Sequence, residues 1–166
     1  RGTPGDTVVA AQARLAGVRE LAPAWVILTL GAQELADERV DAKKLGKELD
    51  ALVDELREKG SAPGGEPVRP PNVLLVGMVP PTLSQADPAA EAEKQATIDG
   101  RTAGWNKVLA SIAAPGQGVT HLDLWSDWPR EGEPRAALTA NGWSLSDQGH
   151  AKIAASVCDA VLAAKP

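Results

Sequence analysis

The chain has 166 residues, of which 43% are hydrophobic and 23% are charged, and its formal net charge at pH 7 is -5. This length and composition predict one ordinary domain with a proper hydrophobic core. The basic residues do not cluster, which excludes nucleic acid as the expected partner, and no apolar run approaches the roughly 20 residues of a membrane-spanning helix. The single cysteine, Cys158, excludes an internal disulfide and a cysteine-rich metal site. Its apolar-periodic surroundings predict a buried thiol.

The N-terminal part of the chain predicts a helix followed by a strand. Asp6 or Thr7 is suited to cap a helix over residues 8–21. Residues 23–31 form a continuous apolar run rich in β-branched side chains, which Gly31 ends. Such a run is typical of a buried strand in a parallel sheet. The expected buried face of the helix consists of Val9, Leu15, Val18 and Leu21.

The rest of the chain continues this alternation of helices and strands. The expected elements are helices within residues 32–60, 88–113 and 144–164 and strands within residues 72–80 and 119–125. In the first of these helices, the apolar residues at helical spacing are Leu45, Leu49, Leu52, Val53 and Leu56. Pro88 is suited to the first turn of the helix that it opens. Alternating helices and apolar strands predict an α/β domain with a parallel sheet over residues 1–166.

An aspartate and a histidine lie close together at the start of the last expected helix. Asp147 and His150 belong to the sequence SDQGH. Histidine is the usual general base in enzymes, and a carboxylate is its usual orienting partner. The structural alternative is an Asp147 cap on the helix with His150 in its first turn, and both interpretations can hold together. In open α/β sheets, sites form at the carboxyl ends of the strands, where this loop can meet residues 31–34 and 78–82.

Several short motifs, taken in order, resemble those of the SGNH, or GDSL-type, hydrolases. RGTPGDT at residues 1–7 resembles the second block of the family, VILTLGAQEL at residues 26–35 its third block, and SDQGH at residues 146–150 its fourth block. From the second block onward, the resemblance spans essentially the whole chain. It implies a flavodoxin-like three-layer α/β/α fold and an activity as an esterase, lipase, thioesterase or carbohydrate deacetylase.

The resemblance also implies roles for individual residues. His150 would be the general base and Asp147 its orienter, while the Gly5 N–H and the Gln33 amide would donate to the oxyanion. Gln33 stands where the family has asparagine, and a displaced oxyanion donor costs about 10²–10³ in rate. Trp143 is a candidate for lining an acyl pocket. The structural alternatives are a turn glycine at position 5, a degenerate residue at position 33 and a packing role for Trp143. No metal or organic cofactor is implied.

Three further polar residues are expected to be structural. Glu34 is interpreted as a carboxylate that orients its loop rather than as an acid catalyst. His121 and Asp123 lie in the third expected strand and are interpreted as structural strand residues.

The first block of the family, a Gly-Asp-Ser turn that holds the nucleophile, has no counterpart in the chain. PGDT at residues 4–7 mimics it, but no strand precedes Thr7. By resemblance, the chain lacks the first strand and its neighbour, so one flank of its own first strand is expected to be unpaired. The chain is then expected to be the C-terminal portion of a longer domain. Three accounts fit this expectation: a cleaved N-terminal segment that stays bound and carries the serine, an inactive relative, or strands supplied by a second subunit.

The predicted function is therefore a serine ester hydrolase of SGNH type that acts on small-molecule esters, with the nucleophilic serine supplied from outside this chain. The alternative is a catalytically inactive binding or structural module on the same fold. A flavodoxin-like phosphate or nucleotide binder is a third option, although no glycine-rich phosphate loop follows any expected strand. The composition leaves the compartment open, and the resemblance favours an exported protein because many members of the family are exported.

Overall fold

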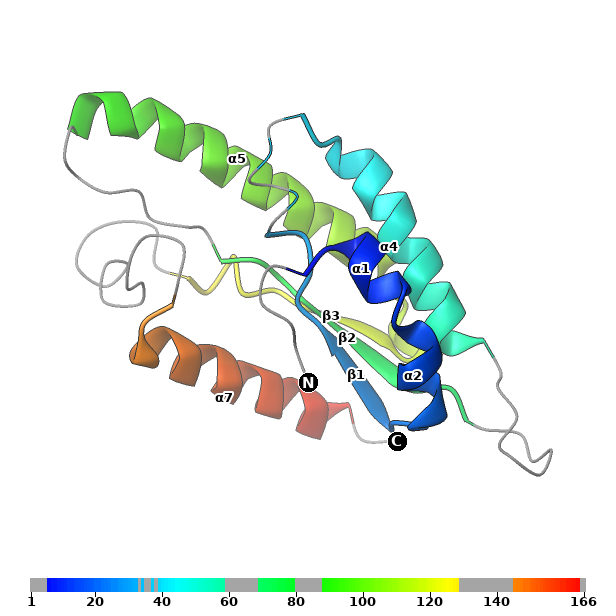
Figure 1. The fold of residues 1–166 in the computed structure, drawn as a ribbon. Helices are drawn as coiled ribbons and strands as arrows, with labels where there is room; N and C mark the ends of the chain where they lie inside the picture. The colour runs from blue at the N-terminus through cyan, green and yellow to red at the C-terminus, as the bar shows by residue number, and fades with distance from the viewer. Residues whose placement is uncertain are drawn as a thin grey trace. The chain divides into compact units, whose positions relative to one another are not determined.

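A computed structural model describes residues 6–32, 34, 37, 39–58, 69–79, 88–128 and 145–164. The elements, shown in Figure 1, are helices α1 (Val8–Gln12), α2 (Leu15–Glu20), α4 (Ala42–Arg57), α5 (Pro88–Ile112) and α7 (Asp147–Ala163), the 3-10 helix η1 (Pro115–Gln117), and strands β1 (Trp25–Leu28), β2 (Asn72–Val76) and β3 (Val119–Leu122). The chain divides into two compact units. The first comprises Arg1–Val76 with Val108–His121, and the second comprises Gly77–Lys107 with Leu122–Pro166.

The three strands form one sheet in the order β1-β2-β3. β1 pairs in parallel with β2, and Trp25 lies opposite Asn72. On the other side of β2, the Val73 N–H donates to the Gly118 carbonyl oxygen just before β3, at 2.8 Å. Parallel strands rich in valine and leucine, separated by helices, are what the alternating sequence pattern predicts. The predicted α/β fold with a parallel sheet is confirmed.

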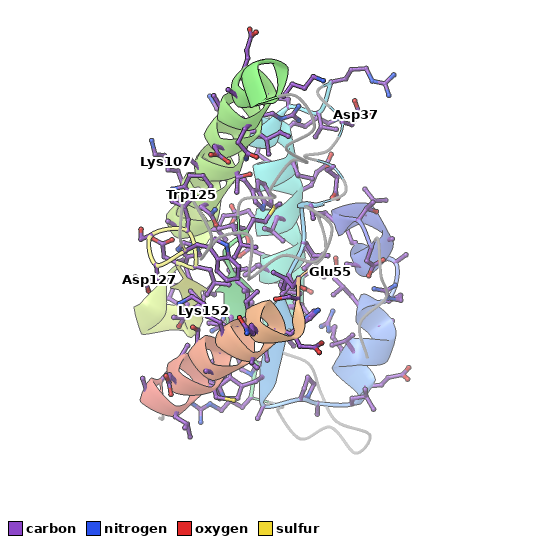
Figure 2. The ribbon with its side chains drawn as sticks, turned by 90° about the vertical axis from the view of Figure 1, so that its left-hand side faces the viewer. Asp37, Glu55, Lys107, Trp125, Asp127 and Lys152 are labelled. Atoms are coloured by element: carbon purple, nitrogen blue, oxygen red, sulfur yellow. The ribbon has the colours of Figure 1, made fainter. Side chains whose placement is uncertain are left out.

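The core of the first unit is built on α4 and β2. All five predicted apolar residues of α4 are at most 4% exposed, as are the β2 residues Val73, Leu74, Leu75 and Val76. α1 and α2 both contact α4 (Figure 1). The Gln12 side-chain amide of α1 donates to Glu55 of α4 at 3.4 Å, and Glu55 is labelled in Figure 2. The strong helical periodicity of α4 therefore predicted its buried face correctly.

The predicted N-terminal helix consists of two short helices instead of one. Thr7 caps α1, and its hydroxyl accepts from the Ala10 N–H at 3.1 Å, as the sequence predicted. The chain then breaks between α1 and α2, so the apolar positions of a single helix no longer share one face. The prediction for the buried face was consequently wrong at two positions. Val9 is 65% exposed and Leu21 is 80% exposed, whereas Val8 is fully buried.

Two predicted burials at other places were also wrong. Ile27 in β1 is 47% exposed, and β1 is the last strand at its end of the described sheet. Cys158 in α7 is exposed, although a buried thiol was predicted. Ile153 and Val157 are half-buried and one helical turn apart, so they mark the partly covered face of α7. Cys158 follows Val157 by one residue, which turns its side chain by about 100° away from that face.

None of the described helices is long and apolar enough to cross a lipid bilayer.

Candidate active site

The motif SDQGH begins α7. Ser146 is the N-cap residue, with extended backbone angles of φ -72° and ψ 170°. Its hydroxyl accepts from the Gly149 N–H at 3.1 Å, and its carbonyl accepts from the His150 N–H at 2.9 Å. The N-cap residue is therefore Ser146. The alternative interpretation of Asp147 as the cap of this helix was wrong. Asp147 is the first helical residue, where a carboxylate interacts favourably with the helix dipole.

Asp147 and His150 lie on one side of α7, because residues three apart in a helix are neighbours. Both residues are exposed. No hydrogen bond or ion pair joins the two side chains, and neither has such a partner in the rest of the described part of the chain. An imidazole that is open to solvent and one turn from a carboxylate has the two groups that a base and its orienter require.

The structure does not test the predicted roles of the other three site residues. Gly5, Gln33 and Trp143 all lie outside the described residues. In the ranges that are described, no group of three histidine, cysteine, aspartate or glutamate side chains is arranged to hold a metal ion.

Glu34 lies on the loop that follows the carboxyl end of β1. Its Oε1 accepts from the Val8 N–H at 2.7 Å, and Val8 is the buried first residue of α1. The first N–H groups of a helix lack partners within the helix, so Glu34 and Thr7 together satisfy two of them. This bond joins the loop after β1 to the turn before α1. It agrees with the predicted role of Glu34 as a loop-orienting carboxylate.

Asn106 of α5 fixes the loop that follows β2, within the second unit. Its Oδ1 accepts from the Met78 N–H at 2.8 Å, and its Nδ2 donates to the Met78 carbonyl at 2.9 Å and to the Thr102 carbonyl at 3.0 Å. Asn106 is only 6% exposed. The sequence reasoning missed this residue. The signal was its position four residues after Thr102, since together they form a polar pair on an otherwise apolar face of the helix.

Asp123 organises the turn that follows β3. Its Oδ1 accepts from the N–H of Trp125 at 2.9 Å and from the N–H of Ser126 at 3.1 Å. Trp125 is labelled in Figure 2. An aspartate that binds backbone N–H groups two and three residues ahead is a common turn device. The predicted structural role of Asp123 is confirmed.

This chain is similar to a family of lipases and acylhydrolases in sequence, and to solved esterase and lipase structures in fold. The sequence model of the GDSL-like Lipase/Acylhydrolase family matches residues 1–152. No curated protein matches the chain. Among solved structures, a catalytic mutant of Axe2, an acetylxylan esterase from Geobacillus stearothermophilus, is 18% identical with a TM-score of 0.67. The alignment covers 92% of this chain and 66% of the Axe2 chain.

Two other solved structures show the same similarity of fold. A GDSL-like lipase from Bacteroides thetaiotaomicron is 16% identical with a TM-score of 0.64, covering 99% of this chain and 75% of that chain. The lipase/acylhydrolase from Enterococcus faecalis is 19% identical with a TM-score of 0.61, covering 95% of this chain and 71% of that chain. The structures share the fold, and the family match extends over far more than half of the sequence. The chain therefore belongs to the GDSL-like lipase/acylhydrolase family, as its motifs predicted.

Proposed function

We propose that the chain is the histidine-bearing part of a serine ester hydrolase that acts on small-molecule acyl or acetyl esters. The observation that carries this proposal is the placement of Asp147 and His150 on the first turn of α7, both exposed, in a member of the GDSL-like family. An acetylxylan esterase and two lipases among its structural neighbours support an ester as the substrate class.

The proposed reaction proceeds through an acyl-enzyme. His150 takes the proton of a serine hydroxyl as that oxygen attacks the ester carbonyl, and Asp147 holds the imidazole and stabilises its charged form. The Gly5 N–H and the Gln33 amide donate to the tetrahedral oxyanion, and Trp143 lines the acyl pocket. His150 then gives the proton to the leaving alcohol, and water hydrolyses the acyl-enzyme by the reverse sequence. This chemistry requires no metal or organic cofactor.

The nucleophilic serine is proposed to come from outside these 166 residues, because no Gly-Asp-Ser sequence occurs among them. The donor is an N-terminal companion fragment or a second subunit that also contributes a strand. The position of β1 at one end of the described sheet, with Ile27 47% exposed, supports this proposal. An unpaired apolar strand edge readily accepts a further strand.

The alternative function is a non-catalytic binding or structural module on the same fold. Two sequence features favour it: the absence of a Gly-Asp-Ser sequence, and glutamine instead of asparagine at position 33.

Hydrolysis of p-nitrophenyl acetate tests the proposal. The protein is isolated from its natural source together with whatever stays bound to it, and the site variants are compared in the same form. We expect Asp147→Asn to lower kcat by about 10⁴-fold, because the imidazole loses its orienting charge. His150→Gln should lower kcat at least as much, because the base is lost. Gln148→Ala is the matched control, since Gln148 is exposed on the same helical turn.

Full activity in folded His150→Gln protein would contradict the assignment of the base. An absence of esterase activity in the natural assembly would favour the non-catalytic module.

A further inference from the structure

A polar cavity of about 240 Å³ opens in the first unit, at the amino ends of β2 and β3. It is lined by the side chains of Arg57, Arg69 and Asn72 and by the turn of residues 116–118. Glu34, by contrast, follows the carboxyl end of β1. β1 and β2 are parallel, so the cavity at the amino end of β2 and the loop that carries Glu34 lie at opposite ends of the strands. The cavity shares no lining residue with the proposed ester site.

The Arg57 guanidinium is held in place by one of its nitrogen atoms. Nη1 donates to the Pro71 carbonyl at 2.7 Å and to the Gly118 carbonyl at 3.3 Å, so it bridges the starts of β2 and β3. Nε and Nη2 have no acceptor within the described part of the chain. The half-buried guanidinium is therefore fixed in orientation and still has donors to offer.

Gly118 makes room for this arrangement. Its φ of +77° lies in the left-handed region that favours glycine. A Cβ at this position would lie 3.0 Å from Arg57 Nη1 and 2.8 Å from Asn72 Oδ1. The glycine thus lets a guanidinium and an amide approach the same turn of the backbone.

The cavity carries two positive charges that no described carboxylate neutralises. Arg14, Arg19 and Arg39 pair with Asp6, Glu58 and Asp37. Arg57 and Arg69 have no such partner among the described residues. The cavity is therefore locally positive in a chain whose net charge is -5. The electrostatic complement of this pair is a compact dianion.

We propose that this cavity binds a phosphate group, either as inorganic phosphate or as the head of a small phosphate ester. Guanidinium groups bind phosphate oxygens in a planar, bidentate geometry, and the Asn72 amide adds a neutral donor. A carboxylate would neutralise only one of the two arginines. The volume is below the roughly 300–1,000 Å³ of sites for drug-sized ligands, which favours a small molecule.

Amide NMR of the natural assembly, in which this chain is isotopically labelled, tests the proposal at constant ionic strength. Sodium phosphate, glycerol 3-phosphate and vesicles that contain phosphatidic acid are the three probes. We expect saturable shifts of the Asn72, Gly116 and Gly118 amides with at least one probe. Saturation with phosphate alone identifies the free ion, saturation with glycerol 3-phosphate identifies a small ester, and binding to vesicles only identifies a lipid headgroup.

Charge variants separate specific from general electrostatic binding. Arg69→Gln removes an exposed charge at the cavity and should weaken binding about tenfold, the size of one lost charge-assisted hydrogen bond. Arg39→Gln is the matched control, because the Arg39 side chain is 89% exposed and does not line the cavity. It should leave the affinity unchanged.

Arg57→Gln would remove two hydrogen bonds to the backbone and could therefore change the structure as well as the charge. Gln117→Glu changes the charge at the cavity and leaves these two bonds in place. Gln117 is exposed and lines the cavity, and a carboxylate there should abolish saturable binding, whereas Gln117→Asn should retain it. The proposal is overturned if none of the three probes gives saturable shifts at these amides. It is also overturned if Arg39→Gln weakens binding as much as Arg69→Gln.

Discussion

At the N-terminus of α1, two side-chain oxygens accept hydrogen bonds from backbone N–H groups that have no partner within the helix. Thr7 accepts from Ala10, which is a local contact that the sequence predicted. Glu34 accepts from Val8 across a separation of 26 residues, which no sequence pattern predicts. The second oxygen of Glu34 is buried and has no hydrogen-bond partner within the described ranges, so the carboxylate is held by the Val8 bond. The Glu34–Val8 bond is therefore the contact by which this carboxylate joins the loop after β1 to α1.

Glu34→Ala should lower the free energy of unfolding by about 1–3 kcal/mol, because the buried Val8 N–H loses its acceptor. Urea unfolding followed by tryptophan fluorescence measures this change. Glu48→Ala is the control, since Glu48 makes only a surface contact with Lys44 at 3.9 Å and should cost no more than about 1 kcal/mol. Equal losses in the two variants would contradict the role of Glu34.

At the scale of elements, α4 packs closely against the end of α5 within the first unit. Gly46 of α4 faces Val108 of α5, and a Cβ at position 46 would lie 2.5 Å from Val108 Cγ1. Valine in a helix has one strongly preferred rotamer, so its side chain cannot turn away at low cost. Gly46, in the second turn of α4, therefore allows the two helices to approach.

Gly46→Ala should lower the free energy of unfolding by about 1–3 kcal/mol through overpacking, although alanine is the better helix former. Val108→Ala should relieve the clash, so the double variant should show a favourable coupling energy in a double-mutant cycle. Gly17→Ala in α2 is the control. No atom lies within 4 Å of its added Cβ, and it should stabilise the protein by about 0.5–1 kcal/mol. A stabilising Gly46→Ala would contradict this account of the packing.

The elements that the sequence predicted well are those with a strong pattern. The regular leucines of α4 and the apolar run of β2 define burial locally, and Pro88 marks the start of α5. The break between α1 and α2 and the exposure of Ile27 depend on contacts with other elements, so the sequence pattern did not reveal them. The same distinction holds at the candidate site.

Asp147 and His150 share one helical turn, so their proximity follows from the sequence alone. The bond between Asn106 and Met78 joins residues 28 positions apart and required the fold. Gln33 and Gly5 lie outside the described residues, and their role in the site stays a prediction.

At the scale of the molecule, the feature that bears on association is the end position of β1 in the described sheet. This strand lies at one end of the strand order and carries Ile27 at 47% exposure. An apolar strand with an unpaired edge favours pairing with another chain, unless a charge such as lysine blocks it. We therefore expect the 166-residue chain, when produced by itself, to self-associate through this edge.

Ile27→Lys should reduce this self-association, because the lysine must lose its hydration when a second chain covers it. Sedimentation velocity over a range of concentrations measures the effect. Val9→Lys is the control, since Val9 is 65% exposed but lies in α1 and not in the sheet. Monomeric wild-type protein across the whole range would contradict the expectation, as would an equal effect of both variants.

The central claim is that an ester hydrolase is completed by a serine from outside this chain. Denaturing intact-mass spectrometry of the natural protein after fluorophosphonate treatment tests it most directly, because the reagent marks an activated serine covalently. The account predicts one adduct on a serine that lies outside residues 1–166, and no adduct within these residues. An adduct on a serine within residues 1–166, or no adduct on any polypeptide of the natural protein, would contradict the claim.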